Sequence, residues 1–299
     1  MKYIIDTDPG VDDAIAICMA VKNKLNIVGF TLASGNIPQV KSEKNLKIIQ
    51  DIIGSNIKMY KGKKEEFVEH TTAEYAHGID GLGYLVYPDT SRKRFERIKA
   101  ENFITKASKK YKNDLTMVCF GSLKNLANAI RKDSRIVKRI KHLLIMGTTY
   151  NPEDKKPYME FNINADPASA RLVLESPFED IKLITHEMGI AAHIDKEYVL
   201  SLRNSQDKVS RFVGTIAEKY MDFSKEKGEY DGLVNPDPAT IADAINGNIF
   251  CFQPCSVKVI DEGKKRGQCY VALVEQSNIK VATDIDLDAF TKLFKETFN

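Results

Sequence analysis

Four aspartates stand close together near the start of the chain. Residues 3–14 read Tyr-Ile-Ile-Asp-Thr-Asp-Pro-Gly-Val-Asp-Asp-Ala, so Asp6, Asp8, Asp12 and Asp13 fall within eight positions, directly after a short apolar run. Like charges this close raise one another's pKa unless a cation or hydrogen-bond donors offset them. The cluster therefore predicts a bound hard metal ion, a tuned acid or base, or both. The plainer alternative is a solvated acidic turn in which an Asp caps a helix.

The backbone expected around these aspartates divides them into two pairs. Asp6 ends the apolar run and is expected to hydrogen-bond the turn, and Asp8 faces the same side before a Pro-Gly pair redirects the chain. Asp12 and Asp13 open a helix, in which neighbouring side chains point about 100 degrees apart. We expect one of them to bind metal and the other to bind substrate. A purely structural explanation for this pair is that helix N-termini favour negative side chains.

Apolar runs alternate with amphipathic stretches through the first two thirds of the chain. Strands are expected at residues 3–6, 27–33, 115–121, 143–147 and 181–185, and helices at 14–22, 40–53, 123–131 and 167–175. This alternation is typical of βαβ units and predicts an α/β fold with a single open, mainly parallel (mixed) sheet flanked by helices. Ligands of such sheets collect beyond the carboxyl ends of the strands, where the acidic cluster and the segments 34–36, 121–124 and 146–148 all fall.

Two further regions depart from this alternation. Residues 65–97 show little periodicity and carry three glycines between positions 78 and 83, which predicts a long functional loop that could be a lid. Residues 250–285 predict a β-rich appendage with strands near 257–260, 269–275 and 279–283. Asp286 is expected to cap a last helix that reaches Phe298. We take residues 1–299 as one domain.

Composition argues against several classes of protein. The 44 basic and 41 acidic residues give a formal charge of +3, and the short basic runs lack interleaved aromatics, so nucleic acid is not expected as a partner. No apolar run approaches the ~20 residues of a membrane span and no signal peptide precedes the first strand, which favours a soluble cytoplasmic protein. The five cysteines are expected to be buried, reduced thiols. Cys251 and Cys255 lack a second pair or a nearby His, so zinc is not expected.

Residues 6–14, Asp-Thr-Asp-Pro-Gly-Val-Asp-Asp-Ala, resemble the signature of the nucleoside hydrolases of the inosine–uridine-preferring superfamily. Other segments resemble landmarks of that family in the same order along residues 3–245: Ala33-Ser-Gly-Asn36, Ala76-His-Gly-Ile-Asp-Gly-Leu82, Gly121-Ser-Leu-Lys-Asn-Leu-Ala127, Met146-Gly147, Met159-Glu-Phe-Asn-Ile-Asn-Ala-Asp-Pro167 and Asn235-Pro-Asp-Pro238. The resemblance implies the family's Rossmann-like fold. It also implies a calcium-dependent N-ribohydrolase that splits a nucleoside, a small-molecule substrate, into ribose and free base.

The resemblance implies a metal site and a catalytic base. Calcium would be held by Asp8, Asp13, the main-chain oxygen of Lys124 and Asp237, an all-oxygen set that suits a hard cation. Lys124 stands where the family has Thr, but a main-chain ligand does not depend on the side chain, and we expect the ammonium group to point away. Calcium would acidify a water, Asp8 would take its proton, and Asn36 would orient the water for attack on the anomeric carbon.

The resemblance also implies substrate contacts. Asp12 and Asn162 would bind the 2′- and 3′-hydroxyls of the ribose and Glu160 would bind the 5′-hydroxyl, and Asn36 is also counted among the substrate-binding residues. Glu160 and Asn162 are two residues apart, so an extended segment would present both on one side. Met146 would contact the ribose, and His77 could approach the base.

One departure from the family concerns the leaving base. Pro236 stands where members that accept both purine and pyrimidine nucleosides have a His that helps the base leave, and proline cannot donate a proton. Another acid such as His77 or Tyr230 would then be needed, or stacking of the base on Tyr220, Phe223 or Tyr230, or a base that already leaves readily. Thr148 replaces a family Gly, and His186 at a strand end is expected behind the substrate contacts.

Two other functions remain open at this point. The missing His would also suit a ribose- or nucleoside-binding protein that does not hydrolyse its ligand. Aspartyl phosphatases likewise carry Asp-x-Asp after a first strand and use the first Asp, here Asp6, as nucleophile, although Pro9 and Gly10 stand where those enzymes have a Thr or Val. The family resemblance suggests a homodimer or a homotetramer.

Overall fold

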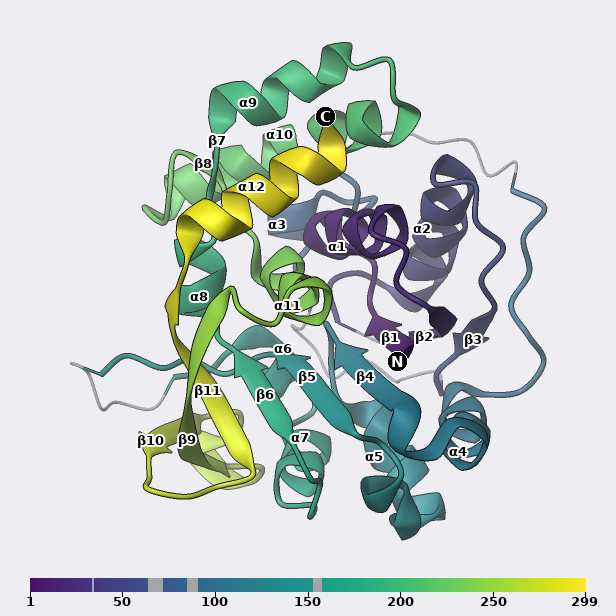
Figure 1. Cartoon of the computed structure of the whole chain (residues 1–299), viewed down its shortest axis with the longest axis vertical. Coiled ribbons are helices and arrows are strands. Elements are labelled where there is room, and N and C mark those ends of the chain that lie inside the picture. The colour runs from purple at the N-terminus through teal and green to yellow at the C-terminus, as the bar shows by residue number, and fades with distance from the viewer. Residues whose placement is uncertain (34, 64–71, 85–90, 153–157) are drawn as a thin grey trace.

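The computed structural model describes residues 1–33, 35–63, 72–84, 91–152 and 158–299. In this part of the chain nine strands form one sheet in the order β10-β9-β11-β6-β5-β4-β1-β2-β3 (Figure 1). Their bounds are β1 Lys2–Thr7, β2 Ile27–Leu32, β3 Met59–Lys61, β4 Leu115–Cys119, β5 His142–Met146, β6 Ile181–Ile184, β9 Phe250–Val259, β10 Cys269–Leu273 and β11 Ile279–Ile285.

The direction in which the sheet grows changes between β1 and β4. The chain first adds β2 and β3 on one side of β1, then returns to place β4, β5 and β6 on the other side, all pairs being parallel. Helices that follow β1 and β4 therefore diverge, which leaves a crevice at the carboxyl ends of these two strands. The crevice is where the aspartates after β1 lie.

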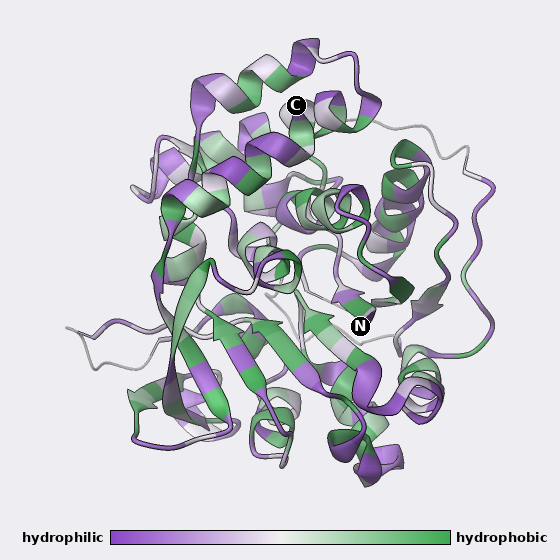
Figure 2. Ribbon diagram, viewed as in Figure 1, coloured by the Kyte–Doolittle hydropathy of each residue, from purple (hydrophilic) through white to green (hydrophobic). Residues whose placement is uncertain are grey.

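Helices cover both faces of the sheet. One face carries α1 Val11–Lys22, α2 Gln39–Ile52, α10 Lys208–Glu226, α11 Pro236–Ile245 and α12 Leu287–Phe298, and the other carries α4 Ala100–Tyr111, α5 Lys124–Lys132 and α7 Pro167–Leu174 (Figure 1). Strand side chains alternate between the two cores: Ile5 and Val118 join the first, Ile4 and Met117 the second. Because both faces are covered, the central strands are largely apolar, as the mainly green strands of Figure 2 show, with polar exceptions such as Lys182 in β6.

Shorter elements complete the fold around the crevice. They are α3 Glu74–His77, α6 Phe161–Ala165, α8 His186–Ala191 and α9 Lys196–Ser201, with the paired strands β7 Ile194–Asp195 and β8 Gly232–Leu233. The five early strands and their four helices were predicted to within a few residues. The three-residue strand β3 was not, because so short an edge strand leaves almost no periodic signal.

The C-terminal strands correct one expectation. They do not form an appendage: β11 pairs in parallel with β6, and β9 and β10 continue the same sheet with antiparallel pairing. β9 is also longer than predicted, from Phe250 to Val259. Cys251 and Cys255 are four positions apart and would share a face in a strictly alternating strand, but the alternation of burial changes phase between residues 253 and 255. Cys255 is buried while Cys251 is exposed, so only four of the five expected buried thiols are found. Asp286 caps α12 by accepting a hydrogen bond from the amide of Ala289, as predicted.

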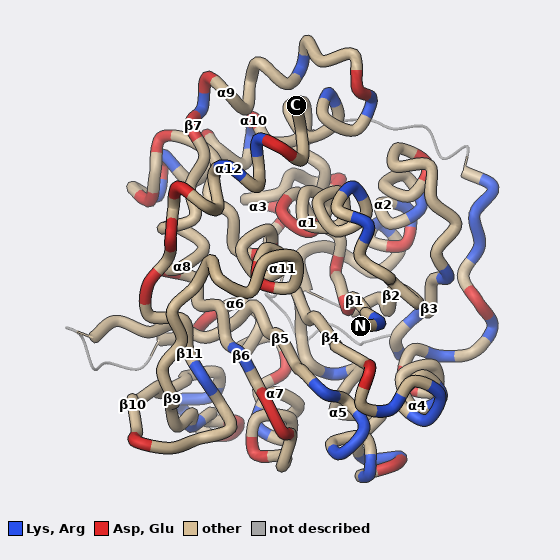
Figure 3. The backbone as a smooth tube through the Cα atoms, viewed as in Figure 1, with Lys and Arg blue, Asp and Glu red and all other residues tan. Residues whose placement is uncertain are grey.

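Ser34 and part of the predicted lid, residues 65–97, lie outside the described residues. The described stretch 72–84 holds α3 against α10. Charged residues are dispersed over the surface, but acidic residues also occur inside the helix layers, at the starts of α1 and α11 (Figure 3). In the described part of the chain, no helix combines the length and apolarity needed to cross a membrane.

Candidate active site

Four buried carboxylates gather in the crevice beyond β1 and β4. Asp8 follows β1, Asp12 and Asp13 lie in the first turn of α1, and Asp237 lies in the first turn of α11. Each residue is at most 7% exposed. One oxygen each of Asp12, Asp13 and Asp237 can be chosen so that all three lie within 4.8 Å of one another. Two helix N-termini thus bring together groups that are 224 positions apart along the chain, from 13 to 237.

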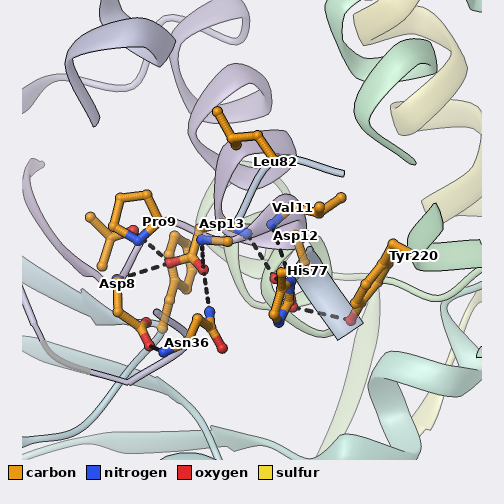
Figure 4. Close-up of polar contacts among 12 residues, drawn as sticks. Asp8, Pro9, Val11, Asp12, Asp13, Asn36, His77, Leu82 and Tyr220 are labelled. Atoms are coloured by element: carbon orange, nitrogen blue, oxygen red, sulfur yellow. Dashed lines mark hydrogen bonds and ion pairs between the residues drawn. The ribbon is translucent and has the colours of Figure 1, made fainter. Parts of the chain in front are cut away.

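Asp13 is the most fully hydrogen-bonded of these carboxylates (Figure 4). Its Oδ1 accepts from the Thr7 hydroxyl at 2.5 Å and from the amide of Asp8 at 3.1 Å, and its Oδ2 accepts from the amide of Gly10 at 3.0 Å and from Asn36 Nδ2 at 2.9 Å. These four donors fix the carboxylate at the centre of the turn. They also fix the turn itself, since three of them come from residues 7–10.

Asp8 has one oxygen bonded and one oxygen open. Its Oδ2 accepts from the amide of Asn36 at 2.7 Å, whereas Oδ1 is buried and has no hydrogen-bond partner among the described residues. The backbone at Gly35 and Gly121 approaches so closely that a Cβ at either position would overlap a carboxylate oxygen of Asp8. A buried, unpaired carboxylate oxygen is costly. A cation at this point would remove that cost.

Burial and mutual repulsion raise the pKa values of the cluster. Burial, with the neighbouring charge of Asp13, raises the pKa of Asp8 well above its usual range, and burial with the charges of Asp12 and Asp13 does the same for Asp237. Burial raises the pKa of Asp12 and of Asp13 to about 6. The four groups offer only oxygen ligands and would be ionised together most readily around a hard divalent cation, which is the predicted type of metal.

Asp12 faces away from this network, toward two rings. Its Oδ2 accepts from the hydroxyl of Tyr220 at 3.3 Å, and its Oδ1 lies 3.7 Å from Nδ1 of His77, whose ring stacks on Tyr220 (Figure 4). His77 Nδ1 accepts the amide hydrogen of Val11 at 3.2 Å, and burial lowers the pKa of His77 to about 4. The imidazole is therefore neutral at pH 7, with one nitrogen already occupied.

Glu160 and Asn162 do not lie in an extended segment, contrary to the prediction. Glu160 is the N-cap of α6, its carboxylate accepting the amide hydrogens of Asn162 at 2.9 Å and Ile163 at 3.0 Å, and Asn162 lies inside that helix. The side chain of Asn162 donates to the carbonyl of Phe120 at 2.7 Å. A five-residue helix was missed because its sequence shows no apolar repeat. Glu160 and Asn162 nevertheless face the same cavity.

Thr148 occupies a backbone conformation that favours glycine. Its φ is 71°, which costs a β-branched residue roughly 1–3 kcal/mol. The strained turn directs the Thr148 amide toward Oε2 of Glu160, at 3.3 Å, and the Thr148 carbonyl toward the amide of His186, also at 3.3 Å. Thr148 thus links the ends of β5 and β6 to one wall of the site.

Most of the predicted site residues line one cavity above the crevice. The predicted residues that line it are Asp12, Asn36, His77, Met146, Glu160, Asn162 and Asp237, together with Tyr220, Phe223 and Pro236. Asp8 and Asp13 are not among the described residues that line it, but both accept hydrogen bonds from Asn36, which does line it.

Three other predicted residues take different positions. Lys124 begins α5, and whether its main-chain oxygen faces the carboxylates stays a prediction. Tyr230 packs at a tilt against His193, with ring centroids 4.0 Å apart, and is not among the described residues that line the cavity. Asp6 turns away from the cavity and from the turn it was expected to bond: it accepts hydrogen bonds from Thr31 and Asn125 and is fully buried. A phosphatase nucleophile at Asp6 is therefore not supported.

Several further residues also line the cavity, and of these the sequence had singled out only His186. Phe120 and Phe161 follow β4 and open α6, Tyr75 comes from α3, and His186 and Glu229 form an ion pair across the opening. His186 was expected behind the substrate contacts. The signal that could have placed it is its position directly after β6, beside the ends of β5 and β4.

Comparison with known proteins gives one consistent result. A family model described as inosine-uridine preferring nucleoside hydrolase matches residues 3–292. Uridine nucleosidase 1 from Arabidopsis thaliana is 28% identical to the chain, over 98% of this chain and 92% of that protein.

Solved structures agree with the sequence comparison. The structure of a plant nucleoside hydrolase is similar with a TM-score of 0.90 and 25% identity, over 99% of this chain and 98% of the other. A purine-preferring ribonucleoside hydrolase from Gardnerella vaginalis is similar with a TM-score of 0.89 and 25% identity, over 100% of this chain and 98% of the other. All three similarities extend across the crevice and its carboxylates.

Proposed function

Because the chain belongs to the inosine-uridine preferring nucleoside hydrolase family, we propose that it is a calcium-dependent N-ribohydrolase that cleaves a ribonucleoside into ribose and free base. It is a hydrolase that acts on N-glycosyl compounds. The observation that carries the finer proposal is that carboxylate oxygens of Asp12, Asp13 and Asp237 lie within 4.8 Å of one another in a buried site. Asp8 is linked to this group by the hydrogen bond from its amide to Asp13, and its own Oδ1 has no partner among the described residues.

Asp8, Asp13 and Asp237, with the main-chain oxygen of Lys124, would hold the calcium ion. The site fits such an ion because all donors are oxygens, because their pKa values are raised without it, and because Asp8 Oδ1 has no other partner among the described residues. When bound, calcium would acidify a water and neutralise the repulsion among the carboxylates.

Asp8 would act as the general base. The amide of Asn36 holds Oδ2 of Asp8, while Oδ1 is buried without a hydrogen-bond partner among the described residues and would accept the proton of the attacking water. Asn36 also donates from Nδ2 to Asp13, so one residue fixes the orientation of both carboxylates. The oxygen of the water forms a bond to the anomeric carbon while the bond from that carbon to the base nitrogen breaks.

The other residues of the cavity would position the sugar. Asp12 and Asn162 would bind the 2′- and 3′-hydroxyls, Glu160 the 5′-hydroxyl, and Met146 would pack against the ring. Glu160 and Asn162 are rigidly placed, since the carboxylate of one caps the helix that carries the other. Burial raises the pKa of Glu160, while three amide hydrogen bonds act in the opposite direction, which leaves a strong acceptor for a hydroxyl.

The proposal is tested by ribose release from inosine, adenosine, guanosine, uridine and cytidine, with protein stripped by chelator and then resupplied with calcium. We expect turnover of at least one nucleoside that is lost with chelator and restored by calcium. Tight nucleoside binding without ribose release would instead support a binding protein. Turnover that continues unchanged in chelator would contradict calcium dependence but not hydrolysis.

Assembly and compartment belong to the same proposal. We propose a homodimer or homotetramer on the family resemblance, and a cytoplasmic protein because four of the five free cysteines are buried thiols. Light scattering on the purified chain and fractionation of the cells that make it test these two points.

A further inference from the structure

The cavity needs a proton donor that Pro236 cannot supply. A base leaves its sugar more easily when it is protonated as the bond breaks, which typically accelerates such a reaction by 10²–10⁴-fold. Two of the previously considered donors are poorly placed. Burial lowers the pKa of His77 to about 4 and its Nδ1 already accepts a hydrogen bond, and Tyr230 packs at a tilt against His193 and is not among the described residues that line the cavity.

One histidine in the cavity is held beside a carboxylate. His186 begins α8 directly after β6, and its Nε2 lies 3.1 Å from Oε1 of Glu229, which belongs to the segment between α10 and β8. Oε2 of Glu229 accepts from the hydroxyl of Ser224 at 3.1 Å, which fixes the carboxylate. Both His186 and Glu229 line the same cavity as Pro236.

The exposure of the pair suits proton transfer to a ligand. The side chain of His186 is 40% exposed and that of Glu229 is 20% exposed. Within the described part of the chain, Nδ1 of His186 makes no hydrogen bond, so a second proton on the ring would point to substrate or water rather than to protein.

We propose that His186 donates a proton to the leaving base and that Glu229 orients His186 and favours its protonated form. The pair would then replace the family histidine in whose place Pro236 stands. This assignment rests on the proposed hydrolase function. As the bond from the anomeric carbon to the base breaks, its electron pair passes to the base and the Nδ1 proton of His186 follows. The water's proton goes to Asp8, and His186 regains a proton from solvent through the opening.

The charges around His186 favour its protonated form. Burial opposes that form, but the hydrogen bond and charge of Glu229 raise the pKa of His186 above its usual value, with smaller contributions from Glu160 and Glu187. Asp12, on α1, faces His186 from the other side of the cavity. All four neighbours are carboxylates, so each favours the cationic ring when ionised.

The test compares a nucleoside with p-nitrophenyl riboside, whose leaving group departs as a stable anion and needs no proton. We expect His186→Gln to lower kcat on the best nucleoside by about 10²–10⁴-fold and to change p-nitrophenyl riboside hydrolysis by less than about threefold. Equal loss on both substrates, or no loss on the nucleoside, would overturn the proposal.

Glu229→Gln provides a second readout. Activity that needs protonated His186 is lost as pH rises through the pKa of that residue, so removing the charge of Glu229 should move the alkaline limb of the kcat profile to lower pH. The p-nitrophenyl riboside profile should not move. A nucleoside profile with an unshifted alkaline limb would contradict the role of Glu229.

His142→Gln is the matched control. His142 also pairs with a carboxylate, Asp180 at 2.8 Å, but it lies at the opposite end of β5 from the site. Its loss should leave both substrates unaffected. If the wild-type protein hydrolyses neither substrate, the hydrolase proposal itself fails. If it hydrolyses only p-nitrophenyl riboside, the ribosyl chemistry stands and His186 as leaving-group acid is overturned.

Discussion

The unpaired Oδ1 of Asp8 lies against the α-carbon of Gly121, with no room between them for a side chain. The second residue after β4 and the first residue after β1 thus contact each other across the switch point of the sheet. Glycine is needed here for close approach. The contact restricts where Oδ1 of Asp8 can lie.

Gly121→Ala should therefore disable the site without adding any polar group. The new methyl group must displace Asp8. We expect calcium affinity and kcat each to fall by about 10-fold or more, as is typical when a residue that positions a metal ligand is mutated. Gly247→Ala is the control, because a Cβ there meets nothing closer than 3.8 Å. Calcium titration with ribose release measures both. Equal behaviour of the two variants would show that Asp8 is not held as described.

Asp8→Asn should lower kcat by about 10³-fold or more with the fold intact, because the amide cannot accept the proton of water. Asp6→Asn is a matched control, because Asp6 is as buried as Asp8 but lies within β1, where it accepts hydrogen bonds from Thr31 and Asn125. Activity of Asp6→Asn within about tenfold of wild type is expected. A larger loss of kcat in Asp6→Asn than in Asp8→Asn would instead support a reaction in which Asp6 is the nucleophile.

The metal-free protein should lose stability as pH rises. Asp12 and Asp13 have pKa values of about 6 in the fold against 3.8 ordinarily, so the folded state binds protons more tightly than the unfolded state. Their contribution is present below about pH 4 and is lost as pH rises through about 6. Chelated protein should melt lower at about pH 8 than at about pH 5. Calcium should raise Tm more at the higher pH; a Tm gain that is independent of pH would contradict this linkage.

The last helix should be important for stability but not for catalysis. Phe290, Phe294 and Phe298 recur every four residues on α12 and are fully buried. Phe294→Ala should lower the free energy of unfolding by about 3–5 kcal/mol, measured by urea titration, while KM stays near wild type. Lys292→Ala, on the exposed side, should change stability by less than about 0.5 kcal/mol. A large change in KM for Phe294→Ala would mean that α12 shapes the site.

The sequence predicted those strands and helices whose residues show a local hydrophobic periodicity. Alternating runs such as 115–121 and 123–131 identified strands and helices, and the rule that ligands collect at carboxyl ends placed Asp8, Asn36 and Met146 together. The C-terminal strands were recognised, but not their place in the main sheet, since pairing of β11 with β6 depends on contacts about 100 positions apart.

The sequence could not predict relationships that arise only in three dimensions. The α6 helix depends on one cap at Glu160, and the pairing of His186 with Glu229 joins residues 43 positions apart with no shared motif. Asp6 was assigned to the turn because its position suggested it. The structure directs it to β2 and α5 instead, where Thr31 and Asn125 supply donors.

The central claim is that calcium bound by the buried carboxylates activates hydrolysis of a nucleoside. The most direct measurement titrates calcium into chelator-stripped protein while bound calcium and ribose release are recorded on the same samples. The account predicts one calcium per chain, with turnover rising in proportion to occupancy, and loss of both binding and turnover in Asp237→Ala. Full turnover without bound calcium, or full occupancy in Asp237→Ala, would contradict it.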